Sequence, residues 1–198
     1  HAQKRRQNSH RLISRRAYCL ERHRNGRQNS AHERKSAGFR AFDPSEDGIG
    51  SSDYLASPLR AWLNSESGFL NPENFSEFDL SLISPARNGD SIFLPSKDML
   101  KNISTADRRR SPTEQCVKND GSRYLTLRKY CWYWTSSPVS TNQSSVTAVT
   151  TTGGFYKTLA ADELCGVCPA MYLRSGILVL CGSGTAENPY ALAGGGER

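Results

Sequence analysis

The sequence predicts an α+β fold in which two short helices flank a twisted, mainly antiparallel sheet. Two observations carry this prediction. Signals for short, capped helices are concentrated between residues 57 and 101, whereas residues 130–181 hold β-branched and aromatic segments separated by turns rich in Gly, Ser and Pro. Helices that come first and strands that come later are typical of α+β domains.

The two helices are expected at "SPLRAWLNS" and "NFSEFDLSLI". Ser57 can cap the first helix, and Pro58 suits its first position because a backbone N–H is not needed there. Ser76 can cap the second helix, with Asp79 completing a capping box, and that helix should end before Pro85.

A short buried strand is expected next, over residues 91–94, followed by a helical turn that Ser96 can cap. Residues 107–129 are polar and charged, and we interpret them as a long surface excursion. The strands of the main sheet are then expected in "YCWYW", "SVTAVTT", "GFYKTL", "VCPAMYL" and residues 177–181.

Alternation along the first of these strands separates its aromatic side chains. Trp132 and Trp134 fall on one face, and we expect this face to pack into the core. Tyr133 falls on the opposite face, where we expect it to be exposed.

Charge divides the chain into a basic arm and a body of slightly negative net charge. The whole chain carries +7, and residues 1–40 hold 12 Lys and Arg against 2 Glu, so the arm carries +10 and the remainder −3. We expect an arm over residues 1–40, a domain over 41–193 and a flexible tail over 194–198. Such an arm can bind nucleic acid or an anionic surface, although its few apolar residues favour a solvated leader. No apolar run is long enough for a transmembrane segment.

Six motifs, in this order, resemble a bacterial and phage domain family of unknown function (number 6273). They are "LRAWLN" at 59–64, "FSE" at 75–77, "IFLPS" at 92–96, "WTSSP" at 134–138, "GVCPAM" at 166–171 and "GSGTAENPY" at 182–190. The resemblance covers residues 41–193. The segment "RLISRRAYCL" is also similar to an early strand of the family, an alignment that would start the domain near residue 10.

The resemblance implies a C-type-lectin-like fold, which formylglycine-generating enzymes share and whose loops bind proteins or sugars. The chain departs from the family in having Cys168 where relatives carry Arg, and Thr135-Ser136 where they carry Leu-Arg. The missing guanidinium groups weaken any function carried over that depends on them. Fold alone does not assign a function.

We expect a non-catalytic module that recognises a protein or carbohydrate ligand. The stretch "SSPVSTNQSSVTAVTTTGG" carries small hydrogen-bonding groups on a loop and an edge strand, although a solvated polar hairpin explains it equally well. The resemblance also implies a version in which this stretch varies, as in the variable proteins of diversity-generating retroelements. The candidate ligand-binding residues are Tyr133, Ser136, Ser137, Ser140, Thr141, Asn142, Gln143, Thr147, Thr150 and Tyr156.

The sequence offers little for catalysis or metal binding, and no cofactor is expected. Cys165 and Cys168 form a C-x-x-C pair, but a second pair is missing and no histidine follows residue 32, which disfavours a zinc site and a hydrolytic triad. Glu187 and Asn188 lack the further oxygen ligands that calcium requires. We expect buried or free thiols first, and a disulfide between two late cysteines second. An oxidative enzyme of the formylglycine-generating type, and binding of nucleic acid or an anionic surface through the arm, stay open as alternatives.

Overall fold

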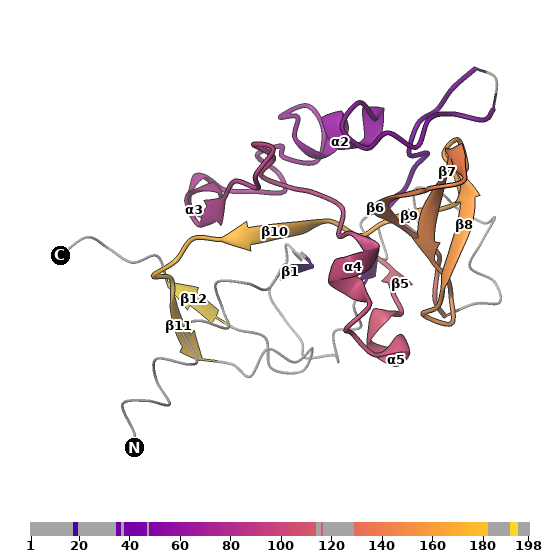
Figure 1. The fold of residues 1–198 in the computed structure, drawn as a ribbon. Coiled ribbons are helices and arrows are strands. Elements are labelled where there is room, and N and C mark those ends of the chain that lie inside the picture. Colours follow the sequence, from indigo (N-terminus) through magenta and orange to yellow (C-terminus); the bar gives the residue numbers. More distant parts are fainter. Residues whose placement is uncertain are drawn as a thin grey trace.

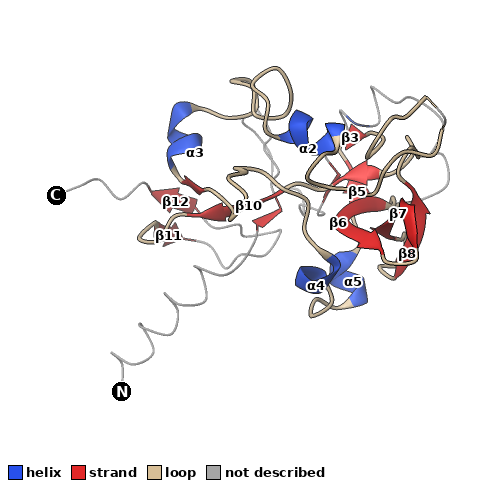
Figure 2. Cartoon of the chain, turned by 45° about the horizontal axis from the view of Figure 1, so that its top comes forward, coloured by secondary structure: helices blue, strands red, loops and turns tan. Residues whose placement is uncertain are grey.

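A computed structural model describes residues 38–46, 48–113, 116 and 129–181, together with short strands at 18–19, 35–36 and 191–193. The fold is α+β, with short helices and long irregular segments around a mixed sheet (Figure 1; Figure 2). Most of the expected arm over residues 1–40 and the expected tail over 194–198 lie outside the described residues.

The helices are short, and none that is described is long and apolar enough to cross a membrane. They are α2 Pro58–Leu63, α3 Glu77–Ser81, α4 Lys97–Leu100 and α5 Thr105–Arg108. The strands are β1 Tyr18–Cys19, β2 Lys35–Ser36, β3 Gly38–Phe39, β4 Ile83–Ser84, β5 Ser111–Pro112, β6 Tyr133–Val139, β7 Asn142–Val149, β8 Phe155–Leu159, β9 Gly166–Val167, β10 Ala170–Leu173, β11 Leu178–Cys181 and β12 Ala191–Ala193.

The main sheet has the strand order β3-β9-β6-β7-β8. Its pairs are antiparallel except for β6 and β9, which run parallel. Three small sheets accompany it: β1-β10-β4 and β11-β12, which are antiparallel, and the parallel pair β2-β5. In Figure 1, β10 leads away from the main sheet toward β11 and β12.

The capping signals in the sequence place three of the helices correctly. Ser57 accepts from the backbone N–H of Arg60 at the start of α2, and Ser76 and Asp79 form both bonds of the capping box of α3. Ser96 caps α4 in the same way as Ser57 caps α2. These bonds satisfy N–H groups that have no partner inside a helix, which explains why such short helices start where they do.

The strand expected over residues 91–94 is wrong. Only Phe93 pairs in a β-bridge, with Ala170. The N–H groups of Ser91 and Ile92 instead donate to the side-chain oxygen of Asn64 at 2.9 and 3.1 Å, while the Asn64 amide donates to the Ile92 carbonyl at 2.8 Å. The Asn64 side chain at the end of α2 therefore forms the backbone hydrogen bonds that a neighbouring strand would otherwise have formed.

Both faces of the β6–β7 pair are buried, so the expected exposure of Tyr133 is wrong. Trp134 lies opposite Ala148 and packs into the larger cluster, where Phe42 contacts it edge-on at 5.6 Å between ring centroids. Tyr133 lies on the other face, in a second cluster with Leu100. Neither Tyr133 nor Trp134 has exposed surface. The alternation was predicted correctly, but the segment around α4 covers the face that was expected to meet solvent.

The interpretation of residues 107–129 as a surface excursion is wrong for its described beginning. Arg108, Arg110 and Ser111 are all buried, and β5 pairs in parallel with β2. Arg110 also forms a β-bridge with Cys131 next to the main sheet. The polar sequence of this segment did not indicate its burial, which is possible because the arginine side chains lie along aromatic rings.

Candidate ligand-binding site

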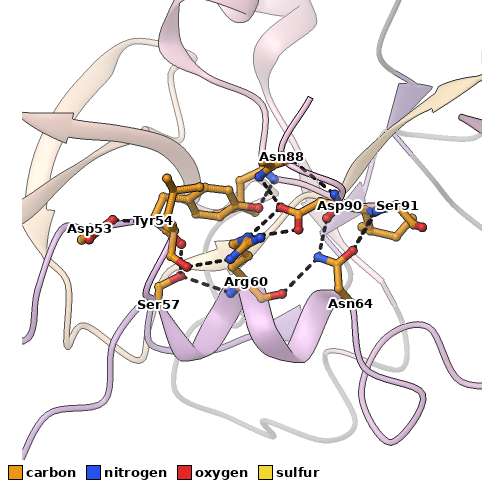
Figure 3. A network of polar contacts seen from close by, with 11 residues as sticks. Asp53, Tyr54, Ser57, Arg60, Asn64, Asn88, Asp90 and Ser91 are labelled. Atoms are coloured by element: carbon orange, nitrogen blue, oxygen red, sulfur yellow. Dashed lines mark hydrogen bonds and ion pairs between the residues drawn. The ribbon is translucent and has the colours of Figure 1, made fainter. Parts of the chain in front are cut away.

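An ion pair between Arg60 and Asp90 joins α2 to the loop before Ile92 (Figure 3). The Nε of Arg60 donates to both carboxylate oxygens of Asp90, at 3.0 and 2.8 Å, and the amide of Asn88 donates to the same carboxylate at 2.6 Å. The hydrogen bond that Arg60 donates to Asp90 raises the pKa of Arg60. An Nη atom of Arg60 also donates to the Leu55 carbonyl at 2.7 Å, so a single guanidinium holds the loop before α2 and the loop at residues 85–90.

Tyr54 lies beside this ion pair, with its ring against Phe42 at 6.0 Å between centroids. Its hydroxyl oxygen accepts from the backbone N–H of Leu94 at 3.1 Å. Burial raises the pKa of Tyr54 to about 12, with a smaller contribution from the negative charge of Asp90. The phenol therefore keeps its proton at neutral pH and can donate it to a ligand.

An irregularity in β6 faces the same region. Between the pairs Trp134–Ala148 and Pro138–Val146, β6 contains two more residues than β7. Thr135 fills the gap, because its hydroxyl donates to the Thr147 carbonyl at 2.6 Å and accepts from the Ser137 N–H at 3.2 Å. Ser136 is freed from the ladder, and its N–H donates to the Pro95 carbonyl at 3.2 Å. Such bulges redirect side chains, often next to functional sites.

Two adjoining hollows meet at Tyr54 and Ser136, and we call them together the Tyr54–Ser136 site. The first has a volume of about 590 Å³ and is lined by Ser51, Ser52, Asp53, Tyr54, Leu55, Ser136, Pro138 and Gln143. The second has a volume of about 440 Å³ and is lined by Tyr54, Pro85, Ala86, Arg87, Asn88, Phe93, Leu94, Met99, Ser136 and Tyr172. Each volume lies in the range typical of ligand pockets.

The structure brings only part of the predicted residue set to this site. Ser136 and Gln143 line it, and the Gln143 carbonyl accepts from the Ser52 N–H at 2.7 Å, which ties the hairpin to the loop before α2. Ser137 is half-buried and accepts from the N–H of Lys97. Three further residues, Ser140, Thr141 and Asn142, are exposed at the tip of the β6–β7 hairpin.

The remaining predicted residues lie elsewhere. Tyr133 is fully buried and its hydroxyl donates to the Arg108 carbonyl at 2.8 Å, while Thr147 is also buried. Thr150 and Tyr156 lie toward the opposite end of β7 from the hairpin tip. Tyr156 is 60 % exposed and packs edge-on against Trp132 at 5.9 Å between centroids.

Sequence reasoning missed the other side of the site, above all Tyr54. The loop that carries Tyr54 was correctly expected to be irregular, and one aromatic in a Gly-, Ser- and Asp-rich loop was the available signal. Nothing in the sequence marked Arg87, Asn88 and Tyr172 as residues of the site. They come from segments far apart in the sequence, which meet because β10 pairs with β4.

The cysteines form no metal or redox centre that can be recognised in the described part of the chain. No group of three or more His, Cys, Asp or Glu side chains suited to a metal occurs among the described residues. Cys165 and Cys168 are both 1 % exposed. Burial, and then the negative charge of Asp162, raise the pKa of the Cys165 thiol well above its usual value, which disfavours the thiolate that oxidative chemistry needs.

The raised pKa of Tyr54 gives a stability prediction at alkaline pH. An unfolded tyrosine loses its proton near pH 10, whereas folded Tyr54 loses it near 12, so its contribution is complete below pH 10 and disappears as the pH rises to 12. We expect unfolding free energy to fall by about 2 kcal/mol more in the wild type than in Tyr54→Phe over this range. Urea denaturation at a series of pH values measures the difference. Tyr156→Phe is the exposed control, and equal pH dependence of Tyr54→Phe and the wild type would contradict the prediction.

Comparisons with known proteins support a family relation for the central part of the chain. The family model described as Domain of unknown function (DUF6273) matches residues 84–175, which is less than half of the chain. The match spans β4 to β10 and so includes both Ser136 and the hairpin. Neither the search of curated proteins nor the search of solved structures gave a significant match.

Proposed function

We propose that the chain is a non-catalytic recognition module that binds a protein or carbohydrate ligand at the Tyr54–Ser136 site. The observation that carries this proposal is the pair of hydroxyl groups shared by the two hollows. Tyr54 accepts one hydrogen bond through its oxygen but donates to no described residue, and the Ser136 hydroxyl has no partner within the described part of the chain. Polar groups of this kind at the centre of an otherwise mixed lining are what orient a bound ligand.

The lining favours binding over catalysis. Tyr54 is a donor rather than a base, because a phenol is protonated at neutral pH and burial raises the pKa of Tyr54 further. The sequence contains no histidine after residue 32 to serve as a general base in this site. An oxidative enzyme would instead need a reactive thiol, and buried Cys165 is poorly suited to that role.

We further propose that this recognition module has a C-type-lectin-like fold. It is supported by the order of the six motifs and by an α+β fold with long irregular segments. In such a module, recognition through loops and strand edges places the contacts where substitutions are tolerated. The retroelement version predicts variation at the exposed hairpin tip, and resequencing codons 132–170 across a population tests it, since invariance there would exclude it.

The binding proposal predicts a loss of affinity when either shared hydroxyl is removed. A glycan array and a panel of surface proteins, probed with the full chain, provide the ligand. Tyr54→Phe and Ser136→Ala should each lower the affinity for that ligand by about tenfold, because each removes one hydrogen bond at the centre of the site. Calorimetric titration of the purified ligand measures the change.

Matched controls separate this site from the hairpin tip. Tyr156→Phe and Ser140→Ala remove the same chemical groups from exposed positions outside the two hollows. We expect both controls to bind as the wild type does. If Ser140→Ala loses affinity while Ser136→Ala keeps it, the ligand binds at the hairpin tip and the proposed site is wrong.

A further inference from the structure

Arg108, at the end of α5, is a buried cation without a counter-charge in the described part of the chain. Only 8 % of its surface is exposed, and its Nε is buried with no hydrogen-bond partner among the residues that the structure describes. No described carboxylate forms an ion pair with it. Buried cations in folded proteins are normally paired, because the loss of hydration is otherwise uncompensated.

An aromatic ring offers the only described compensation. The guanidinium carbon of Arg108 lies 4.4 Å from the centroid of Phe155, and the ammonium nitrogen of Lys97 lies 5.6 Å from the same centroid. A ring face attracts cations but accepts hydrogen bonds only weakly. Two positive charges are therefore gathered around a ring that neutralises neither of them.

The surrounding segments add positive charge. Arg109 follows α5 and stacks on Tyr130 at 4.7 Å, and Lys129 lies 5.7 Å from the same ring. Figure 2 shows α4 and α5 side by side next to β6, β7 and β8. The hydroxyl of Tyr133 holds the Arg108 carbonyl from inside the sheet at 2.8 Å, so the position of this arginine is set by the core.

We propose that Arg108 and Lys97 form an oxyanion-binding subsite beside Phe155, which takes a phosphate, sulfate or carboxylate group of a ligand. A guanidinium presents several N–H donors in one plane and binds such anions through charge-assisted hydrogen bonds. The ammonium group of Lys97, which is exposed, supplies a second charge from the solvent side. This subsite lies on the face of the sheet opposite the Trp134 cluster, and it does not depend on the Tyr54–Ser136 site.

The test uses the full chain with inorganic phosphate and with acetate as probes, against sodium chloride at equal ionic strength, because exposed charges also respond to salt alone. Thermal unfolding and calorimetric titration measure the response. We expect phosphate or acetate to raise the unfolding midpoint of the wild type beyond chloride. A larger response to phosphate assigns a phosphate-like group, and a larger response to acetate assigns a carboxylate.

Variants identify the residues responsible. Arg108→Met should abolish the anion response and should be at least as stable as the wild type in anion-free buffer, because an uncompensated buried charge is replaced by an apolar side chain. Lys97→Gln should weaken anion binding about threefold to tenfold, and Arg108→Lys should retain part of it. Lys101→Gln removes a nearby cation that pairs with Asp98 and should leave binding unchanged.

Three results would overturn the proposal. The first is a wild type that responds to phosphate and acetate no more than to chloride. The second is an anion response that survives in both Arg108→Met and Lys97→Gln. The third is an equal loss of response in Lys97→Gln and Lys101→Gln, which would indicate a diffuse effect of positive charge. Because Lys97→Gln changes an exposed residue, this comparison remains decisive even if Arg108→Met fails to fold.

Discussion

Replacing Asp90 with Asn should lower the free energy of unfolding by about 2–3 kcal/mol. The Asp90 side chain is 6 % exposed, and its carboxylate accepts from both Arg60 and Asn88. Asn keeps the shape but removes the charge, which leaves the partly buried guanidinium of Arg60 without its counter-ion. Chemical denaturation of the two proteins measures the loss.

The matched control is Asp98→Asn, which breaks an exposed ion pair with Lys101. Exposed pairs contribute little, so this variant should lose less than about 0.5 kcal/mol. Equal losses of unfolding free energy in the two variants would show that the Arg60–Asp90 pair stabilises the fold no more than the exposed Asp98–Lys101 pair does. Because Arg60 also holds the Leu55 carbonyl, we expect Asp90→Asn to weaken ligand binding at the Tyr54–Ser136 site as well.

Replacing Gly153 with Ala should cost about 3 kcal/mol, through backbone strain and a steric clash together. Gly153 has φ +82°, a left-handed conformation that disfavours a side chain. A Cβ at this position would overlap with the backbone of Thr105, the first residue of α5. The turn between β7 and β8 therefore approaches α5 so closely that only glycine fits.

Two other glycines separate the two causes. Gly154→Ala adds a methyl group at an ordinary contact distance, 3.5 Å from Thr150, and should be nearly neutral. Gly176 has φ +88° and open space around its Cβ position, so Gly176→Ala reports strain alone, about 1 kcal/mol. Thermal and urea unfolding of the three variants should rank Gly153 first. A loss at Gly153 no larger than at Gly176 would mean that α5 moves aside without cost.

Local signals explain the parts of the fold that the sequence predicted well. The starts of α2, α3 and α4 depend on Ser57, Ser76 and Ser96, each of which bonds a backbone group within three residues along the chain. The strands β6, β7 and β8 overlap the predicted β-branched and aromatic runs, although β6 extends to Val139 and β7 begins at Asn142, within residues that were expected to form a loop. For these elements, the residues that decide the structure are neighbours in sequence.

The errors arose where distant segments decide the outcome. The Asn64 side chain takes the backbone groups of residues 91 and 92, and the segment around α4 covers the face of β6 that carries Tyr133. Alternation tells which residues share a face but not whether a second layer covers that face. In the same way, all ten residues of the predicted ligand-binding set carry polar groups, but polarity along a strand could not show that only Ser136 and Gln143 of this set line the two hollows.

The sequence by itself determined the α+β class, the starts of three helices and the presence of the three strands of the β6–β7–β8 meander. Those features depend on local hydrogen bonds and on the two-residue period of a strand. Only the tertiary structure decided that Tyr54 and Ser136 line the same hollows, that Arg60 is held by Asp90 across 30 residues, and that Arg108 is buried without a counter-charge among the described residues. Each of these depends on packing between segments far apart in the chain, which a local pattern does not encode.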